Sequence, residues 1–421
     1  MKIKLIYPKW SKLTGQTEFI LPPHGPLVFA AALPDYVEVD FVDENVQTLN
    51  FDETADLICI SMMLTTQVKR GWEIADTYRA KGKKVLFGGI STMLHAEETM
   101  QHADSVFMGE AEGRMEEVLN DFQNGGLKPI YNYLTKPPVI ESVGPARRDL
   151  LERDLYYHKG VQMVDLFHAS RGCKYNCYPC AVSFLGGRKF RARPFDRIAE
   201  ELDTIDNNRL FVVDNTLAQD NEWTKELFRT MIPFKKKWCS HTIADDPDVL
   251  DLAAQAGSWY VYQAVFDTSD YIRERIKRYH DHGIAVEGTI LLGMDNQTED
   301  DIKRLLDFLG EIDLDLAEFT VLTPFPETKA YDDMLKEGRI FDHEWNHYGA
   351  DTVVYKPKHM SPERLQELYY YAWDSFYKNE SQEQKMFKLM MKVVEREMED
   401  GTYRKPRKDL MESSFGKVVD R

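Results

Sequence analysis

Residues 163–182 of this 421-residue chain read MVDLFHASRGCKYNCYPCAV, an apolar run of strand length followed directly by a loop rich in cysteine. Cys173, Cys177 and Cys180 are spaced C-x3-C-x2-C and are three of the five cysteines in the chain. Thiolates hold zinc and inorganic clusters, so this clustering indicates a metal site. A loop after a barrel strand lies at the face where barrel enzymes carry out their chemistry.

The odd number of cysteines separates two kinds of metal site. A cubane 4Fe–4S cluster normally takes four cysteine ligands, so three cysteines leave one iron without a protein ligand. A zinc site would need a fourth Cys or His, and His168 is the neighbouring residue of that kind. The spacing favours an iron–sulfur cluster over zinc, and a structural coincidence is the third alternative.

Strand-length apolar runs alternate with helical patterns around and beyond this loop. The predicted strands cover residues 163–170, 209–215, 258–267, 285–293 and 316–325. Repeated strand–helix units of this length predict a partial TIM-like (β/α)6 barrel at 150–340. The Ser-Pro-Glu start at Ser361 then predicts a helical segment to about residue 400, within a mainly helical C-terminal domain at 341–421.

The first 140 residues show the same alternation and predict a second α/β unit. Its strands are predicted at residues 3–8, 37–43, 56–63, 84–90 and 105–110. The pattern is typical of a Rossmann-like parallel sheet domain at 1–140, which a Pro-rich connector at 134–151 joins to the barrel. Ligands of such sheets bind beyond the carboxyl ends of the strands. Gly88 and Gly89 at one such end would let a ligand approach the backbone, or would form an ordinary turn.

Composition and charge exclude several classes of protein. Hydrophobic residues make up 43% of the chain, which is ample for buried cores, and the formal net charge is −17. A strongly acidic protein does not suit a nucleic-acid partner, because phosphate binding needs a basic surface. No apolar run is long enough for a transmembrane segment, and the N-terminus lacks the apolar core of a signal peptide. We therefore expect a cytoplasmic protein whose cysteines are free for metal binding.

Taken together, these residues resemble the cobalamin-dependent branch of the radical S-adenosylmethionine (SAM) superfamily. Within the barrel, the resemblance rests on the cysteine loop with its preceding RGC, on FLGGRKFRARPFDRIAEEL at 184–202 and on GIAVEGTILLGMD at 283–295. In the first domain, VLFGGISTMLHAEE at 85–98 and ADSVFMGEAEGRMEEVL at 103–119 resemble that branch's cobalamin-binding domain. The resemblance covers about residues 1 to 380.

The resemblance implies three cofactors and one type of reaction. Cys173, Cys177 and Cys180 would hold a 4Fe–4S cluster, SAM would bind the open iron, and the first domain would bind cobalamin. A C-methyltransferase of this kind uses one SAM to methylate cobalamin and cleaves a second to a 5′-deoxyadenosyl radical, which activates an unactivated carbon for methylation. An electron donor such as ferredoxin or flavodoxin is also implied. The sequence has no D-x-H-x-x-G motif, so no histidine of that motif would bind the cobalt.

The resemblance also implies site residues, most of them at strand ends. For SAM these are Tyr178, Pro179, Arg191, Arg193, Asp214, Asn215, Gln263, Gly293 and Thr323. The two arginines could pair with the SAM carboxylate, or could be solvated charges. For cobalamin, the strand-end loops offer hydroxyls and backbone N–H groups at Thr65, Thr66, Gly88, Gly89, Ser91, Gly109 and Glu110. Pro179 stands where the superfamily usually has an aromatic residue, and the stretch around Gln263 also departs from the usual pattern.

The substrate and two competing functions stay open at this point. Relatives methylate peptides, lipids such as hopanoids, and antibiotic precursors. The absence of an obvious membrane-binding helix favours a peptide or protein side chain, with the glutamine of methyl-coenzyme M reductase as one specific candidate. The alternatives are a lipid or natural-product substrate, a non-methylating rearrangement or cyclisation, and a non-catalytic iron–sulfur or zinc protein. Aromatic residues between 345 and 377 could line a substrate entrance or simply pack in a helical core.

Overall fold

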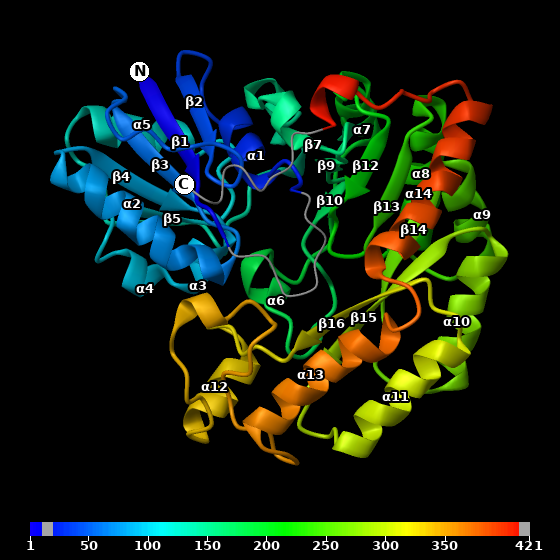
Figure 1. Ribbon diagram of the computed structural model, residues 1–421. Coiled ribbons are helices and arrows are strands. Elements are labelled where there is room, and N and C mark those ends of the chain that lie inside the picture. The colour runs from blue at the N-terminus through cyan, green and yellow to red at the C-terminus, as the bar shows by residue number, and fades with distance from the viewer. Residues whose placement is uncertain (11–19, 412–421) are drawn as a thin grey trace.

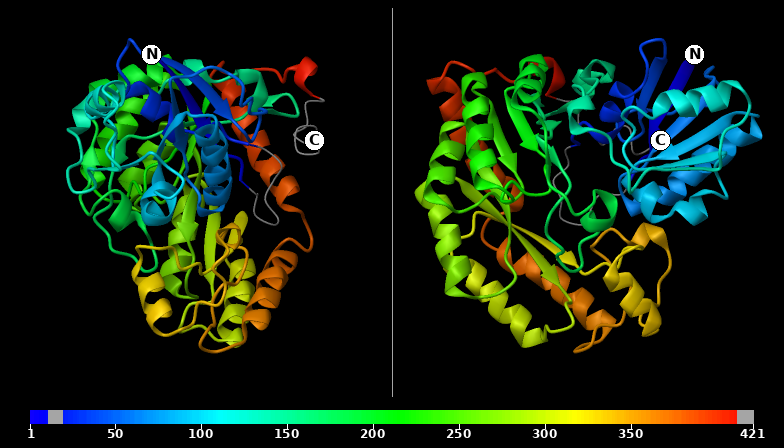
Figure 2. Two further views of the ribbon diagram at one scale, coloured as in Figure 1. Left: turned by 90° about the vertical axis from the view of Figure 1, so that its left-hand side faces the viewer. Right: turned by 180° about the vertical axis from the view of Figure 1, so that it is seen from behind.

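The computed structural model of the protein describes residues 1–10 and 20–411, and it contains two parallel sheets set side by side (Figure 1). Both are covered by helices, and two long helices near the C-terminus lie against the second sheet (Figures 1 and 2). This confirms the predicted α/β fold class. The sheets fall inside residues 1–140 and 150–340, and the exact domain boundaries stay predictions.

Within the described residues, six parallel strands form the first sheet in the order β2-β1-β3-β4-β5-β6. Their bounds are β1 Lys2–Tyr7, β2 Glu38–Asp43, β3 Leu57–Ser61, β4 Lys84–Gly88, β5 Ser105–Met108 and β6 Ile130–Asn132. The helices that cover them are α1 Gly25–Ala31, α2 Val68–Ala80, α3 Ile90–Leu94, α4 Ala96–Thr99 and α5 Met115–Gln123. The strand order changes direction at β1 and β3, which places a binding crevice at their carboxyl ends.

The second sheet has the strand order β9-β12-β13-β14-β15-β16, so its strands follow one another in sequence. The bounds are β9 Asp165–Phe167, β12 Arg209–Val212, β13 Lys237–Ser240, β14 Ser258–Ala264, β15 Ala285–Leu292 and β16 Leu316–Val321. The outer helices are α7 Phe195–Thr204, α8 Asn221–Met231, α9 Pro247–Gln255, α10 Asp270–Asp281 and α11 Glu299–Glu311, followed by α12 Lys329–Lys336. These units form the predicted partial (β/α)6 barrel. The sequence patterns missed β13, because its four residues include Lys237 and Ser240.

Strand alternation divides the barrel residues into an outer and an inner set. Val212, Trp238 and Val261 are fully buried and belong to the core between the sheet and its helices. The residues one place along each strand point the other way, into the barrel. These inner residues include aromatic and acidic side chains as well as apolar ones, as described below.

The C-terminal helices complete the barrel rather than forming a core of their own. Helix α13 (Pro362–Phe376) begins as predicted, with Ser361 as N-cap and proline at its first turn, and it packs on α11 and β16. Helix α14 (Gln382–Glu399) packs against residues near the start of the barrel strands. Its Leu389 and Val393 lie in one apolar cluster with Trp259 and Tyr260 of β14. This helix therefore closes the amino-terminal end of the barrel interior.

Ion pairs hold α14 and the turn after it in this position. Arg209 at the start of β12 is paired with Glu397 at 2.8 Å, and Lys237 at the start of β13 is paired with Asp400. Arg396 donates to the carbonyls of Ser258 and Gly283 at 2.9 and 3.0 Å.

The segment before α13 has a different role, because Trp345, Tyr348 and Val354 pack in the core of the first domain. The predicted helical domain at 341–421 thus begins with about twenty residues whose only helical stretch is the 3-10 turn Trp345–His347, and α13 follows them.

Candidate active site

The cysteine loop lies between the short strand β10 (Ser170–Arg171) and helix α6 (Val182–Leu185). Gly172 precedes Cys173 with a φ of +76°, and a Cβ there would lie 2.1 Å from the carbonyl oxygen of Lys189. Only glycine fits this turn, which gives the RGC sequence a structural reason. The backbone N–H of Cys180 donates to the carbonyl of Cys177 at 2.9 Å, so the second half of the loop is a tight turn.

All three thiols of the loop are free, and those of Cys177 and Cys180 belong to exposed residues. Burial raises the pKa of Cys180, and the neighbouring Cys177 and Cys173 raise it further, so the three sulfur atoms lie in one electrostatic environment. Among the described residues, no three His, Cys, Asp or Glu side chains converge tightly enough to hold a single metal ion. Three thiols in one short loop, two of them on exposed residues, suit a cluster, whose ligands bind different iron atoms, better than one zinc ion.

A cavity of about 790 Å³ extends from the first domain into the barrel. On the side of the first domain, its lining includes Met63, Gly88, Gly109 and other residues at the carboxyl ends of β3, β4 and β5. Beside the cysteine loop it is lined by Gly172, Val182 and Gly186. The carboxyl ends of both sheets therefore face one shared space, as expected for strand-end binding in α/β folds.

The cavity continues into the barrel along the inner residues of all six strands. From the strands and the residues directly after them these include Leu166, Phe211, Val213, His241, Tyr262, Glu287 and Glu318; the helices α13 and α14 add Trp373, Gln382 and Met386. The sequence analysis did not single out these side chains. The signal was a glutamate inside each of the apolar strands β15 and β16, since buried charged residues rarely lack a role.

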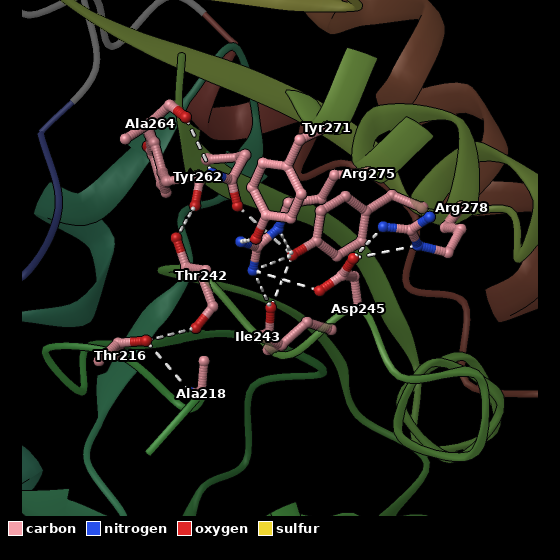
Figure 3. A network of polar contacts seen from close by, with 12 residues as sticks. Thr216, Ala218, Thr242, Ile243, Asp245, Tyr262, Ala264, Tyr271, Arg275 and Arg278 are labelled. Carbon is pink, nitrogen blue, oxygen red and sulfur yellow. Dashed lines mark hydrogen bonds and ion pairs between the residues drawn. The ribbon is translucent and has the colours of Figure 1, made fainter. Parts of the chain in front are cut away.

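Polar contacts fix the loops at the carboxyl ends of the barrel strands. Thr216 after β12 donates through Oγ1 to the carbonyl of Thr242 at 2.9 Å, and Thr242 donates to the carbonyl of Tyr262 at 3.0 Å. Arg275 of α10 donates to the carbonyl of Ile243 at 3.2 Å (Figure 3). Three successive loops are thus tied to one another and to a helix, which makes this rim a rigid frame for a ligand.

A charged network connects the two domains next to the cysteine loop. Arg171 donates to Glu110 at 2.6 Å and to Glu112 at 2.7 Å, and Arg191 also pairs with Glu110. Burial alone would raise the pKa of Glu110, but the hydrogen bonds of the two arginines hold this pKa below its ordinary value. Since Arg171 is two residues before Cys173, the network sets the position of the cysteine loop relative to the first domain.

Two histidines extend this network across the domain junction. The Nε2 atom of His24 and the Nδ1 atom of His168 lie 2.7 Å apart, and Arg171 donates to the other ring nitrogen of His168 at 3.2 Å. Burial and the guanidinium of Arg148 lower the pKa of His24 to about 3, and burial also lowers the pKa of His168. Both rings are therefore neutral at pH 7, and His168 is engaged within this network.

The predicted SAM residues divide into two groups. Asp214 and Asn215 line the cavity, and Asp214 accepts hydrogen bonds from the Ala169 N–H at 2.8 Å and from the Ser170 hydroxyl. Burial raises the pKa of Asp214 to about 6. The side chain of Gln263 instead lies on the helix side of β14, where Tyr279 of α10 contacts it at 3.4 Å, because alternation points its neighbour Tyr262 inward.

The remaining predicted SAM residues do not line the cavity. Gly293 accepts a hydrogen bond from the hydroxyl of Tyr355, and Thr323 donates to the carbonyl of Val321 at 3.1 Å. Tyr178 is exposed, and the bond between it and Pro179 is cis. A SAM contact at any of these four residues stays a prediction without support from the cavity lining.

The two predicted SAM-binding arginines are already paired with carboxylates. Arg191 binds Glu110, as described above, and Arg193 is fully buried, donating to Glu201 at 2.6 Å and to the carbonyl of His168 at 2.7 Å. The alternative of solvated charges is therefore wrong for Arg193. A contact of Arg191 with the SAM carboxylate would have to compete with its pair. Arg193 keeps Nε and Nη2 buried without a hydrogen-bond partner among the described residues, but it does not line the cavity. Both contacts stay predictions.

The predicted cobalamin residues also divide into two groups. Gly88, Gly89, Gly109 and Glu110 line the cavity, whereas Thr65, Thr66 and Ser91 do not. Thr65 is buried, and its hydroxyl oxygen lies 3.2 Å from Nε2 of His95. A Cβ at Gly88 would meet no atom within 4 Å, so the glycine leaves open space beside the cavity. An open space of this kind fits a large flat ligand lying on the strand ends.

The stability of the barrel interior should depend on pH through Glu287. Its carboxyl accepts a hydrogen bond from Tyr260 at 2.6 Å, and burial together with the nearby Glu318 raises its pKa from 4.5 to about 8. Because the folded pKa is the higher one, the free energy of unfolding should fall as the pH rises from 4.5 to about 8, by up to roughly 1.4 kcal/mol per pH unit. Urea unfolding of the wild type and of Glu287→Gln across this range measures the contribution, and parallel pH profiles for both proteins would contradict it.

Comparisons with known proteins agree with this geometry. A family model described as the B12 binding domain matches residues 11–119. The bacteriochlorophyllide d C-12(1)-methyltransferase of Chlorobaculum tepidum is 25% identical over 370 residues, which cover 82% of this chain and 80% of that protein. The hopanoid C-2 methylase of Rhodopseudomonas palustris is 23% identical over 400 residues, with 84% of this chain and 73% of the methylase covered.

Two solved structures share the fold. The radical SAM methyltransferase TsrM from Kitasatospora setae, with tryptophan substrate and a SAM analogue bound, aligns with a TM-score of 0.65 over 90% of this chain and 89% of that chain, at 14% identity. The cobalamin-dependent radical SAM enzyme OxsB, with aqua-cobalamin and SAM bound, aligns with a TM-score of 0.64 over 94% of this chain and 71% of that chain, also at 14% identity. At this identity the likeness shows the fold of both units and their order.

Proposed function

We propose that this chain is a cobalamin-dependent radical SAM enzyme, and that it is a C-methyltransferase that acts on an unactivated carbon. The observation that carries the proposal is the single cavity shared by the strand ends of the first domain, the flanks of the cysteine loop and the barrel interior. Methyl donor, radical source and substrate must meet in one space that excludes water. The alternative of a non-catalytic metal protein gives no reason for such a cavity.

The residues present fit the three cofactors of this family. Cys173, Cys177 and Cys180 offer thiol ligands for a 4Fe–4S cluster, and Gly88 leaves room for the corrin ring of cobalamin. Asp214, at the end of β12, lines the cavity next to the loop and could accept a hydrogen bond from SAM. When bound, the cluster and SAM supply hydrogen-atom abstraction, and cobalamin supplies a transferable methyl group.

The chain's own residues supply position and exclusion of water. The pairing of Arg171 with Glu110 and Glu112 fixes the cysteine loop against the first domain, so the cluster and the corrin would keep one separation. Helix α14 closes the far end of the barrel with Leu389 and Val393, which keeps bulk water from the substrate. No proton transfer needs to be assigned to a side chain for a hydrogen-atom abstraction.

The cobalamin assignment predicts a selective effect at Gly88. In Gly88→Leu the new side chain would project into open space and fill the cavity, so the fold should persist while cobalamin affinity falls. Overpacking costs about 1–3 kcal/mol, which corresponds to a roughly 5- to 150-fold higher Kd for hydroxocobalamin. Gly310→Leu on helix α11 adds the same side chain in open space outside the cavity and serves as control. Unchanged cobalamin binding by Gly88→Leu would contradict the assignment.

The reaction is tested with anaerobically purified enzyme, reductant, cobalamin and methyl-labelled SAM. Formation of S-adenosylhomocysteine together with 5′-deoxyadenosine is expected, with label in a C–C-bonded methyl group of the product. Formation of 5′-deoxyadenosine without methylated product would favour the rearrangement or cyclisation alternative. If neither compound forms with any substrate fraction, the proposal fails.

For the substrate we propose a peptide or protein side chain, of which the glutamine of methyl-coenzyme M reductase is one candidate. None of the helices in the described residues is both long and apolar enough to span a bilayer. The bacteriochlorophyllide and hopanoid enzymes among the relatives make a tetrapyrrole or a lipid the second candidate class. Incubation of the enzyme and labelled SAM with cell lysate, followed by separation of protein from lipid and pigment, distinguishes them. The cytoplasmic location and the ferredoxin or flavodoxin donor stay predictions.

A further inference from the structure

Two large apolar side chains are exposed on the side of the cavity that the first domain provides. We call the cavity-lining residues at and directly after the carboxyl ends of β3, β4 and β5 the floor of the cavity. Met63 follows β3 and is 47% exposed, and Ile90 follows β4 and is 41% exposed; both belong to the floor. Exposed apolar side chains that gather in a concave surface mark a ligand site. These two indicate a ligand that rests on the strand ends with an apolar face.

Backbone hydrogen bonds join the two loops that carry these side chains. The N–H of Met62 donates to the carbonyl of Gly88 at 3.0 Å, and the N–H of Ser91 donates to the carbonyl of Met62 at 2.9 Å. Gly89 permits this close approach, since its φ is +93° and a Cβ there would lie 2.4 Å from the carbonyl oxygen of Met62. The ends of β3 and β4 therefore form one continuous surface.

A buried amide holds the loop after β3 in place. Oε1 of Gln67 accepts hydrogen bonds from the N–H groups of Met63 and Leu64 at 2.7 and 2.9 Å. Gln67 is fully buried, and its Nε2 donates at 2.6 Å to the carbonyl of Pro8, the residue that follows β1. The loop is thus anchored to the strand on the other side of the point where the strand order changes direction. The backbone of Met63 is fixed while its flexible side chain lines the cavity.

The floor offers no basic nitrogen that could bind a metal. Among the described residues, the floor contains no histidine, lysine or arginine. The described histidines that line the cavity are His24, His168 and His241. The first two are hydrogen-bonded to each other, and Nδ1 of His241 lies 2.7 Å from the carbonyl of Asp214 in the barrel. A metal above the floor would meet apolar side chains instead of the imidazole that proteins most often use as a ligand.

The layout of the cavity decides which face of a corrin ring would meet the floor. A flat ring on these strand ends has one face on the floor and the other toward the cysteine loop and the barrel interior, which line the rest of the cavity. The proposed reaction needs the transferable methyl group on the face toward the barrel, because the substrate carbon and the radical source are there. The floor therefore faces the opposite axial position of the cobalt.

We propose that Met63 covers the axial position of the cobalt that is turned away from the barrel and, together with Ile90, keeps water and nitrogen ligands from the metal. The inference rests on the proposed function and adds to it the residue that faces the cobalt. Met63 is the better placed of the two, since it follows β3, which borders the point where the strand order changes direction. The apolar shell around a metal controls solvent access and the reduction potential.

The test is electron paramagnetic resonance of the holoenzyme, loaded with cluster and hydroxocobalamin and reduced mildly to the Co(II) state. A nitrogen ligand on the axis splits each cobalt line into a triplet, and a bound water broadens the lines in 17O-labelled water. The wild type is expected to show neither effect. Met63→His should show the triplet, which becomes a doublet in protein labelled with 15N-histidine. Met63→Ala should show the broadening, because water then reaches the cobalt.

The matched control is Met391→His on α14. Met391 is 42% exposed, close to the exposure of Met63, and it does not line the cavity, so this variant should give the wild-type spectrum. A triplet or 17O broadening in the wild type would overturn the inference, because a ligand would then occupy the position assigned to Met63. A Met63→His protein that binds cobalamin without a triplet would overturn it as well. If Met63→His takes up no cobalamin, the alanine variant decides, and lines that do not broaden there overturn the inference.

These spectra do not depend on turnover, so the inference and the proposed function can fail separately. The expected spectra in an enzyme that forms no S-adenosylhomocysteine with any substrate fraction would refute only the methyltransferase. Methyl transfer by a wild type whose cobalt carries a nitrogen or water ligand on the floor side would refute only the assignment of Met63. A wild-type chain that binds no cobalamin would refute both.

Discussion

Replacement of any one of Cys173, Cys177 and Cys180 by alanine is expected to abolish the iron–sulfur cluster and to reduce 5′-deoxyadenosine formation to background. Each side chain would be one of three protein ligands to a cubane cluster that already lacks a fourth, so no spare thiol can replace it. Loss of an outer-shell partner alone typically costs a metal site about 10–100-fold in affinity or activity. Loss of a direct ligand should exceed this.

Iron and sulfide content per chain, the visible absorbance of the cluster and its change on addition of SAM measure the effect. Cys59→Ala is the matched control, because Cys59 is a buried residue of strand β3 in the first domain and burial raises its thiol pKa well above the usual range. This variant should keep the iron of the wild type. A cysteine-loop variant that retained both full iron content and the SAM-dependent spectral change would show that the cluster is bound elsewhere.

The sequence predicted the order of the elements and the cysteine loop because both depend on local patterns. Apolar runs of strand length and the capping signal at Ser361 act within a few residues, and the structure has a strand or a helix start at each of them. The short strand β6 at the edge of the first sheet was not predicted. Strand β13 was missed because its charged Lys237 pairs with Asp400, which follows α14 more than 160 residues later. No local pattern reports such a partner.

The inner lining of the barrel was harder to predict than the strands themselves. Which face of a strand points inward depends on its parity, and a shift of one residue exchanges the two faces. Gln263 was chosen and Tyr262 lines the cavity, an error of one position in a correctly predicted strand. The lining that Gln382 and Met386 add to the cavity also depends on α14, whose docking into the barrel is a tertiary event. Glu287 and Glu318 nevertheless left a sequence signal, since each interrupts an apolar strand.

The arginines were assigned from chemistry alone, and the structure shows why that was insufficient. A guanidinium near the cysteine loop suits a carboxylate, but the sequence does not say whose carboxylate it is. Arg193 binds Glu201 eight residues later, whereas Arg191 binds Glu110 of the other domain. Each pair joins two segments that come close together only in the folded protein. The residues that hold the loop in place were thus visible in the sequence, but their partners were not.

The buried triad formed by Arg148, Glu201 and Arg193 should be one of the most sensitive points of the fold. Glu201 accepts from Arg148 at 2.7 Å and from Arg193 at 2.6 Å, and all three side chains are at most 7% exposed. Burial alone would raise the pKa of Glu201, but the two guanidinium groups lower it, so the carboxylate stays ionised. Arg148 belongs to the connector and Arg193 to the segment after the cysteine loop, so the triad joins the domain junction to the barrel.

Glu201→Ala is expected to lower the free energy of unfolding by about 3–5 kcal/mol, because it leaves two buried guanidinium groups without their counterion. Glu200→Ala, one residue earlier on the exposed face of α7, removes the same side chain from a surface pair with Arg197 and should change stability little. Guanidinium chloride unfolding of the three proteins gives the comparison. Replacing the whole triad by apolar residues, as in the variant R148M/R193M/E201L, should recover most of the loss, since it is the unpaired charge that is costly. Equal destabilisation by Glu200→Ala and Glu201→Ala, or no recovery in the apolar variant, would show that the side-chain volume of Glu201 matters more than its charge.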